Sequence, residues 1–139
     1  MIQITKAVRF CASHRYWRED WSAEENARRF GKCTNIHGHN YRLEITIQGE
    51  PAPDTGMIID LKEVKIILQQ MIIDPLDHQY LNEAVPYFKE HIPTTENLVI
   101  YIRDILQKAF LPATVKRIRL WEDIDLSVEW EEISDADFD

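Results

Sequence analysis

The sequence has few of the residues that loosen a chain or cross-link it. Its 139 residues include four Gly, six Pro and two Cys, against 45% hydrophobic residues. This composition is typical of one ordered globular domain rather than a disordered or linker-rich chain. A chain of this length can bury a core without disulfides, so Cys11 and Cys33 are expected to be free thiols. We expect one domain over residues 1–130 and an acidic tail over residues 131–139.

Basic charge and long apolar runs are also scarce. The 16 Lys and Arg are outnumbered by 24 Asp and Glu, and the net charge of −8 disfavours a general nucleic-acid backbone binder. No apolar run reaches the about 20 residues needed to span a bilayer. The N-terminal residues alternate in polarity and lack the apolar stretch of a signal peptide. The sequence therefore predicts a cytoplasmic protein with neither a nucleic-acid nor a membrane partner.

The polarity pattern predicts both strands and helices. Apolar and polar residues alternate, as in strands, over residues 2–10, 37–47, 115–121 and 126–130, and a short returning strand is expected over residues 57–59. Helical spacing begins after Asp60 and after Thr94 or Thr95, and a short helix begins at Ser22 with a capping box. This order predicts an α+β fold, with an antiparallel sheet of four main strands and two long helices.

The strongest chemical signal is the His37-Gly38-His39 tripeptide. On a strand, residues i and i+2 point to the same face, so both imidazoles project to one side. His14, just beyond the first predicted strand, is the available third ligand. Three imidazoles with an open position are typical of a catalytic zinc site. Taken alone, an H-x-H pattern is equally compatible with chance or with core packing.

Cys33 precedes His37 by four residues and lies in a loop that leads to this predicted metal site. A thiol near a divalent cation and near Arg28, Arg29 and Lys32 is expected to ionise readily, which would make it a base or a nucleophile. Two alternatives remain open from the residues alone. Cys33 is either an inert thiol or a fourth ligand that closes the metal site.

Three acidic positions have both a chemical and a structural interpretation. Asp77 and His78 can form a proton relay in which the carboxylate orients the imidazole, or they decorate a surface loop. Glu122 shares the parity of the apolar strand residues before it, and its carboxylate can accept two hydrogen bonds from an amidine-like edge, such as that of a pterin. It can equally be an ordinary turn residue. Glu96 stands at a helix start, where the helix dipole alone explains a carboxylate.

Together these residues resemble the 6-pyruvoyltetrahydropterin synthase / 6-carboxytetrahydropterin synthase family. The resemblance covers nearly the whole chain except the acidic tail. The motifs that carry it are F-C-A-S-H-R (10–15), S-A-E-E-N (22–26), F-G-K-C (30–33), H-G-H-N-Y (37–41), G-M-I-I-D-L (56–61), P-L-D-H-Q-Y-L-N (75–82), P-T-T-E-N (93–97) and L-W-E (120–122). Eight ordered matches with consistent spacing make chance very improbable.

The resemblance implies a zinc enzyme and assigns roles residue by residue. The expected zinc ligands are His14, His37 and His39. The expected catalytic residues are Cys33 as the base and Asp77 and His78 as its partners in proton transfer. The residues expected to bind the pterin are Glu122, which anchors the ring, and Glu96 and Thr95, which line the pocket.

The resemblance also implies a substrate and an assembly. The family substrate is 7,8-dihydroneopterin triphosphate, and the chemistry is proton movement along its hydroxylated side chain. Family members have the tunnelling fold (T-fold), in which the sheets of three subunits close into a barrel. Two such trimers stack into a homohexamer, with the active sites between subunits.

The spacing between Cys33 and His37 separates the two branches of the family. Members of the biopterin branch typically have five residues at this point, whereas this chain has three, residues 34–36, as is usual in the 6-carboxytetrahydropterin synthases of queuosine synthesis. Other motifs, among them F-G-K-C, look closer to the biopterin enzymes. We give the spacing more weight because it sets the reach of the base, and we expect 6-carboxy-5,6,7,8-tetrahydropterin, acetaldehyde and triphosphate as products. The alternatives are a 6-pyruvoyltetrahydropterin synthase and a noncatalytic zinc-containing pterin-binding protein.

Overall fold

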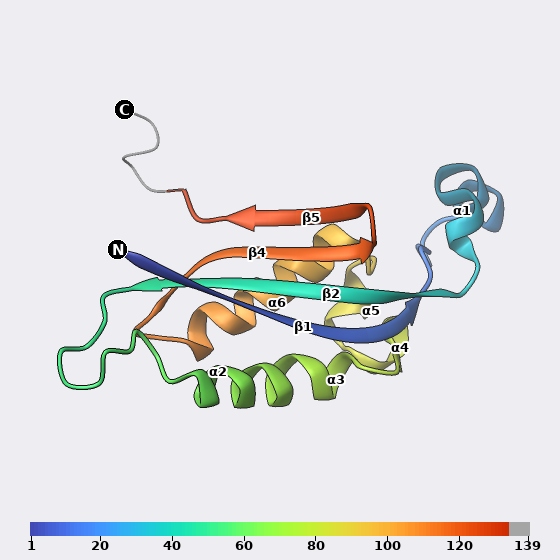
Figure 1. The fold of residues 1–139 in the computed structure, drawn as a ribbon. Coiled ribbons are helices and arrows are strands. Elements are labelled where there is room, and N and C mark those ends of the chain that lie inside the picture. Colours follow the sequence, from blue (N-terminus) through green and yellow to red (C-terminus); the bar gives the residue numbers. More distant parts are fainter. Residues whose placement is uncertain (134–139) are drawn as a thin grey trace.

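The computed structural model describes residues 1–133, and a twisted five-stranded sheet runs through the whole molecule (Figure 1). The sheet has the strand order β3-β1-β2-β4-β5. Its strands are β1 (Ile2–His14), β2 (His37–Gly49), β3 (Gln79–Tyr80), β4 (Thr114–Asp123) and β5 (Leu126–Glu131). The four long strands pair antiparallel, and the two-residue β3 pairs parallel with the end of β1.

Two long helical segments cover one face of this sheet (Figure 1). The first is continuous and consists of α2 (Leu61–Leu68), the π-helical turn η2 (Gln69–Ile73) and α3 (Asp74–Leu76). The second is α6 (Thr95–Ala109). The shorter helices are α1 (Ala23–Phe30), the 3₁₀ turn η1 (Gly31–Thr34), α4 (Leu81–Ala84) and α5 (Tyr87–Glu90). None of the helices within residues 1–133 has the length and apolar character that a membrane crossing requires.

The core lies between the sheet and these two helical segments. Alternate residues of β2 are fully buried, namely Tyr41, Leu43, Ile45 and Ile47. The helices contribute residues at helical spacing, namely Val64, Leu68, Ile72, Leu98, Ile102 and Leu106. The intervening β2 residues Arg42 and Glu44 lie on the other face and bond to each other. Each strand of the sheet therefore has a helix-facing side and an open side, which decides where each functional side chain lies.

The predicted α+β class and antiparallel pairing are confirmed, but two details of the predicted sheet are wrong. The sheet has five strands because β3 joins the edge of β1 through tertiary pairing. Residues 57–59 form no strand, because β1 and β4 already occupy both sides of β2. The backbone instead closes a turn, with the Met57 carbonyl accepting from the Ala52 N–H, and Asp60 then caps α2.

The predicted acidic tail, residues 131–139, falls largely outside the described residues. Glu131 is the last residue of β5, and residues 134–139 are not described. The division into a domain over residues 1–130 and a tail stays a prediction.

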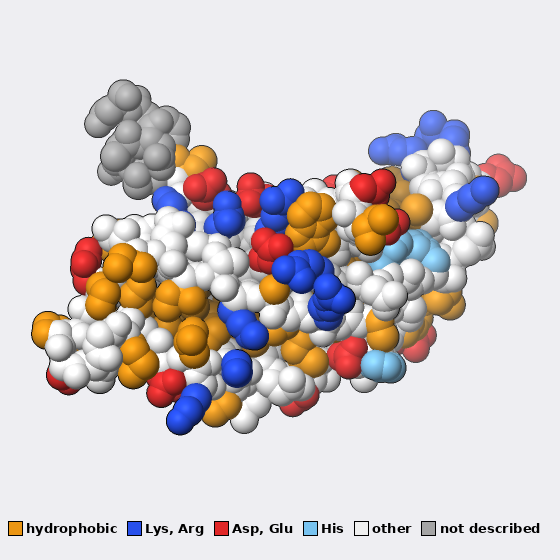
Figure 2. Space-filling model, in the orientation of Figure 1, with side chains coloured by type: hydrophobic (Ala, Val, Ile, Leu, Met, Phe, Trp, Pro, Cys, Tyr) orange, Lys and Arg blue, Asp and Glu red, His pale blue; other side chains and the backbone are white. Residues whose placement is uncertain are grey.

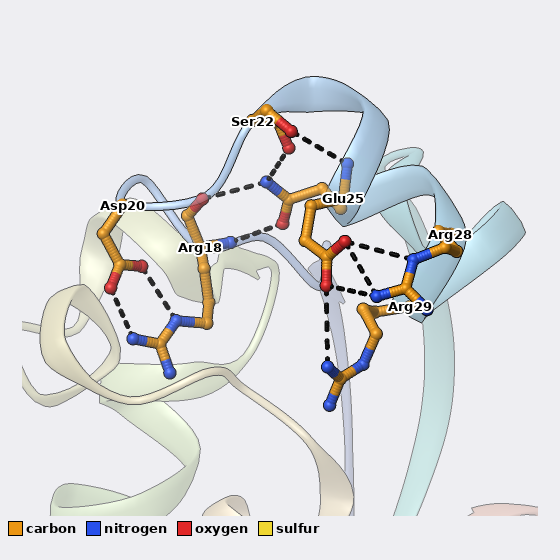
Figure 3. A network of polar contacts seen from close by, with 7 residues as sticks. Arg18, Asp20, Ser22, Glu25, Arg28 and Arg29 are labelled. Carbon is orange, nitrogen blue, oxygen red and sulfur yellow. Dashed lines mark hydrogen bonds and ion pairs between the residues drawn. The ribbon is translucent and has the colours of Figure 1, made fainter.

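The helix α1 stands beyond the end of the sheet, where β1 ends and β2 begins (Figure 1). The predicted capping box is present, since the Glu25 N–H donates to the Ser22 hydroxyl at 3.0 Å. Figure 3 shows the ion pairs that surround it, in which Arg18 binds Asp20 and Glu25 binds both Arg28 and Arg29. These exposed pairs contribute little to stability on their own.

One buried side chain connects α1 to the segment that follows β1. Asn26 is fully buried, and its Oδ1 accepts from the Arg18 N–H at 2.8 Å. Its Nδ2 donates to the carbonyl oxygens of Arg18 (2.9 Å) and Ser22 (3.0 Å). Because a buried amide must be paired to be tolerated, this network sets how α1, and the turn η1 after it, lie against the end of the sheet.

Candidate active site

Three histidines meet on the helix-facing side of the sheet, at the end next to α1. His14 and His37 are directly opposite each other in the register of β1 and β2. His39 lies two residues further along β2 and therefore on the same face. One ring nitrogen from each histidine lies within 4.8 Å of the other two, with His14 buried and the other two partly exposed. Figure 2 shows histidine surface at this end of the molecule.

The hydrogen bonds of these rings orient them as metal ligands. The Nδ1 atom of His14 is 2.7 Å from the Pro93 carbonyl oxygen, and that of His37 is 2.8 Å from the Asn35 carbonyl oxygen. A carbonyl only accepts, so each Nδ1 carries the proton and each Nε2 has a free lone pair. These two Nε2 atoms face each other at 3.0 Å. Two lone pairs at this distance repel unless a cation lies between them.

The third histidine supports the same conclusion. The Nε2 atom of His39 is buried, has no hydrogen-bond partner within residues 1–133 and lies 3.4 Å from Glu122 Oε1. A buried ring nitrogen without a partner is costly in a protein interior, and a metal ion would satisfy it. The pKa of His14 is lowered to about 4, mainly by burial and also by the neighbouring His37 and His39, whereas the bond to Pro93 raises it. His14 is therefore neutral at physiological pH, which is the form that binds metal. The donor set fits zinc.

Two tyrosines and two carboxylates surround the cluster. The ring of Tyr16 packs edge-on against that of His14, with centroids 5.2 Å apart. Burial raises the pKa of Tyr16, and the charges of Glu122, Cys33 and Glu96 raise it further. The Tyr16 hydroxyl is thus close to three groups that the sequence predicts to be functional, although they come from three separate segments.

Tyr41 forms the floor of this region on β2, two residues beyond His39. Its ring is fully buried, and its hydroxyl lies 3.4 Å from His14 Nδ1. Burial raises the pKa of Tyr41, and Glu122 and Tyr16 add to the effect. Tyr41 is therefore a neutral hydroxyl next to the histidines.

Cys33 lies in η1 at the rim of the cluster and is partly exposed. Its carbonyl accepts a hydrogen bond from the Tyr16 N–H at 2.8 Å, which ties η1 to the residues after β1. The Asn26 network holds the preceding helix. The position of η1 is thus set by the backbone bond to Tyr16 and by the side-chain bonds of Asn26.

The start of α6 closes the other side of the site. The Thr94 hydroxyl caps the helix by accepting from the Asn97 N–H at 3.1 Å, and Pro93 just before it supplies the carbonyl that orients His14. Thr95 is 3% exposed, and its hydroxyl has no hydrogen-bond partner among the described residues. Glu96 is close enough to act on Tyr16. Glu96 therefore lies near Tyr16 and the histidine cluster, and Thr95 is the buried residue just before it on α6.

Asp77 and His78 lie apart from this group, at the edge of β1 next to Cys11. The Cys11 N–H donates to Asp77 Oδ1 at 2.9 Å, and the His78 N–H donates to the Cys11 carbonyl at 2.6 Å. The His78 Nδ1 atom is 2.9 Å from Asp77 Oδ2. These contacts separate Asp77 and His78 from the histidine cluster of the same chain, whereas Glu122 lies beside His39, and Cys33 and Glu96 act on Tyr16.

Sequence reasoning missed Tyr16, Asn26 and the Pro93 carbonyl. Tyr16 follows His14 by two residues. In an extended segment this spacing indicates that both side chains point to the same side. Asn26 was visible only as a part of a motif. The bond from Pro93 joins residues 79 positions apart, and no local pattern indicates it.

The fold and the site together define a class of proteins with a cluster of three histidines that could hold a metal ion on a twisted antiparallel sheet. The profile of the family described as 6-pyruvoyl tetrahydropterin synthase matches residues 3–132. The chain belongs to this family, whose members include lyases of pterin metabolism.

Individual relatives come from both branches. The chain is 42% identical to the 6-pyruvoyl tetrahydrobiopterin synthase of Pongo abelii over 122 residues, 86% of this chain and 84% of the relative. It is 28% identical to the 6-carboxy-5,6,7,8-tetrahydropterin synthase of Aquifex aeolicus over 159 aligned positions, 94% and 98% of the two chains. The solved structure of Caenorhabditis elegans 6-pyruvoyl tetrahydropterin synthase has a TM-score of 0.87 at 30% identity, covering 95% of this chain and 96% of the other.

Proposed function

We propose that this protein is a zinc-dependent lyase that converts 7,8-dihydroneopterin triphosphate and one water molecule to 6-carboxy-5,6,7,8-tetrahydropterin, releasing acetaldehyde and triphosphate. Zinc binding is supported by the three converging ring nitrogens. One of them, His39 Nε2, is buried and has no hydrogen-bond partner among the described residues. His14, His37 and His39 would hold the ion. Bound zinc acts as a Lewis acid that lowers the pKa of hydroxyls held next to it.

The residues around the histidines are proposed to remove the proton and to bind the pterin. Cys33, at the rim of the cluster, is the proposed base that removes a proton from the substrate side chain. The carboxylate of Glu122 is the proposed anchor for the pterin ring, because it can accept two hydrogen bonds from the ring's 2-amino and N3 groups. Thr95 and Glu96 are proposed to line the pterin pocket.

Asp77 and His78 are the proposed partners of Cys33 in proton transfer. Their side chains bond to each other and to Cys11 rather than to the residues of the histidine cluster. We therefore propose that they act in the site of a neighbouring subunit, within a homohexamer made of two trimers. The imidazole of His78 is 78% exposed and so accessible to a second chain.

The choice of product rests on the short connection between Cys33 and His37. This connection is two residues shorter than the five-residue connection of the biopterin branch. Because each residue spans at most about 3.3–3.6 Å, the difference shifts the reach of the thiol by several ångströms. A displacement of about 1 Å can change a rate about a hundredfold, so such a shift can change which proton is removed. Cys33 lies in a 3₁₀ turn tied to Tyr16, which supports a thiol held at a fixed reach.

A 6-pyruvoyltetrahydropterin synthase is the second candidate. The higher identity to a relative of that name, 42% against 28%, favours it. Overall identity reports on the whole chain, whereas the Cys33–His37 spacing acts at the reacting atoms, and we therefore rank the carboxy product first. A noncatalytic pterin-binding protein would need zinc and Glu122 but neither Cys33 nor the Asp77–His78 pair.

The deciding experiment is product analysis with 7,8-dihydroneopterin triphosphate as the only substrate. We expect acetaldehyde, trapped as it forms, in equal amount to triphosphate and to a pterin with the mass of the carboxy product. The Cys33→Ala protein with its zinc retained is the matched control and should release none of the three. Triphosphate without acetaldehyde would assign the pyruvoyl branch, and no turnover by the zinc-loaded wild-type protein would favour the binding protein.

A further inference from the structure

A second group of metal-binding side chains lies on the other side of β1 from the histidine cluster. It consists of Cys11, Asp77 and His78, whose ligand atoms all lie within 4.8 Å of one another. Cys11 comes from β1, and the other two come from the turn between α3 and β3. No described residue is shared between this group and the histidine cluster.

The backbone holds this group in place. The Cys11 N–H donates to one oxygen of Asp77, and the Cys11 carbonyl accepts from the His78 N–H at 2.6 Å. The hydrogen bond from Cys11 lowers the pKa of Asp77, and His78 lowers it further, so the carboxylate is ionised at neutral pH. Its second oxygen, 2.9 Å from His78 Nδ1, is free for a metal ion once the imidazole turns.

The group is also accessible. A hollow of about 350 Å³ adjoins it, lined by Cys11, Ala12, Ser13, Gly38, His39, Asn40, His78 and Gln79. The imidazole of His78 is 78% exposed, so its ring can rotate to bring a nitrogen toward the thiol and the carboxylate. Gly38 allows close approach of the two strands beside the hollow, because a Cβ there would lie 3.1 Å from the Ala12 carbonyl oxygen.

We propose that Cys11, Asp77 and His78 form a second metal site that takes a thiophilic divalent cation such as Zn²⁺. Thiolate sulfur, carboxylate oxygen and imidazole nitrogen are the three side-chain ligand types that zinc uses. Within residues 1–133 the group offers three ligands, so water would complete the coordination and the affinity would be below that of a closed four-ligand site. Binding replaces the thiol proton of Cys11, which leaves to solvent.

If the proposed function holds, a metal ion at this second site inhibits turnover. A metal ion bound to Asp77 and His78 removes both from proton transfer, so zinc beyond one equivalent per chain inhibits turnover. The same cation then activates at the histidine cluster and inhibits at the second site.

The test is a titration of the zinc-loaded protein, one zinc per chain, with Co²⁺. A thiolate bound to Co²⁺ gives a charge-transfer band in the near ultraviolet, and the chain has only two cysteines, so single variants assign the band. We expect one Co²⁺ per chain with this band in the wild-type and Cys33→Ser proteins. Cys11→Ser, which keeps the backbone bonds to Asp77 and His78, should lose the band and bind Co²⁺ at least about tenfold more weakly.

A second variant changes another ligand, so the result does not depend on the effect of Cys11→Ser on β1. His78 has a φ of 61°, and asparagine is one of the few residues that adopt this conformation readily. His78→Asn should therefore keep the fold and weaken Co²⁺ binding at least about tenfold. A band that survives in Cys11→Ser and disappears in Cys33→Ser would overturn the proposal, as would the absence of a second bound ion in the wild-type protein.

The inhibition is measured separately. If turnover occurs, excess Zn²⁺ should inhibit the wild-type enzyme and Cys11→Ser should resist it. Equal inhibition of both would reject the regulatory consequence while leaving the binding result intact. An inactive enzyme that still binds Co²⁺ through Cys11 would contradict the proposed function but not the second site.

Discussion

Cys11 and His14 lie three residues apart on β1, and their side chains point to opposite sides of the sheet. His14 is buried on the helix-facing side with His37, its direct partner in β2. Cys11 lies on the open side, next to Asp77 and His78. Because side chains alternate along a strand, this three-residue spacing separates the two reactive groups of one chain.

The first prediction follows from this separation. If the proton relay of each site comes from a neighbouring subunit, Cys33→Ala and His78→Ala chains are each inactive alone. Mixed and reassembled in equal amounts, they should recover up to about a quarter of wild-type activity, because that share of sites pairs an intact Cys33 with an intact His78. Turnover of 7,8-dihydroneopterin triphosphate measures the recovery.

Mixed assembly must be verified independently, for example by mass spectrometry of chains with different tags. Mixing Cys33→Ala with Cys33→Ala chains of a second tag provides the control and should stay inactive. No recovery in verified mixed assemblies would mean that each chain supplies its own relay.

The second prediction concerns the metal. We expect one zinc per chain at the histidine cluster of the wild-type protein, and His37→Ala and His39→Ala should each lose it, since each removes one of three converging nitrogens. Cys33→Ala should retain zinc and lose turnover, because the thiol lies at the rim. Metal content by mass spectrometry, measured beside activity, checks all three. Loss of zinc from Cys33→Ala would make the thiol a ligand and refute its role as base.

Much of the histidine cluster was predictable because it depends on local rules. The H-x-H spacing on a strand places both rings on one face, and the pairing of His14 with His37 brings in the third. Ser22 and Asp60 were recognisable as helix caps because capping uses neighbouring residues. The parity of Glu122 likewise predicted its inward direction, and it lies 3.4 Å from His39.

The parts that were not predictable depend on contacts between distant segments. The two residues of β3 are a strand only because the edge of β1 is free beside them. Residues 57–59 have a strand-like composition, but both sides of β2 are occupied. The tautomer of His14 depends on a carbonyl 79 residues away. Such features follow from tertiary packing and leave no periodic signal.

The third prediction tests how α1 positions Cys33. Asn26→Ala removes a buried amide and leaves the Arg18 N–H without its acceptor, whereas the Arg18 and Ser22 carbonyls keep their backbone donors; the loss should cost about 1–3 kcal/mol in the free energy of unfolding. Because the amide holds the helix before η1, kcat should also fall at least about tenfold, while zinc content is unchanged. Denaturant unfolding, metal analysis and kinetics measure the three effects.

Ser22→Ala provides the matched control in the same helix. It removes an exposed cap, costs about 1 kcal/mol or less, and should leave kcat close to that of the wild-type enzyme. If Asn26→Ala is less stable but has a normal kcat, the network stabilises α1 without positioning the thiol.

The last prediction concerns the pH dependence of the metal-free protein, prepared with a chelator. Burial lowers the pKa of His14 from 6.5 to about 4, so between these values the unfolded chain binds a proton that the folded chain does not. The free energy of unfolding should therefore be greatest above pH 6.5 and fall with decreasing pH, by up to about 1.4 kcal/mol per pH unit. Denaturant unfolding between pH 5 and pH 7 measures the slope above the range in which most carboxylates titrate. His14→Gln removes the titrating group and should flatten this part of the curve, and an equal slope in both proteins would show that another group is responsible.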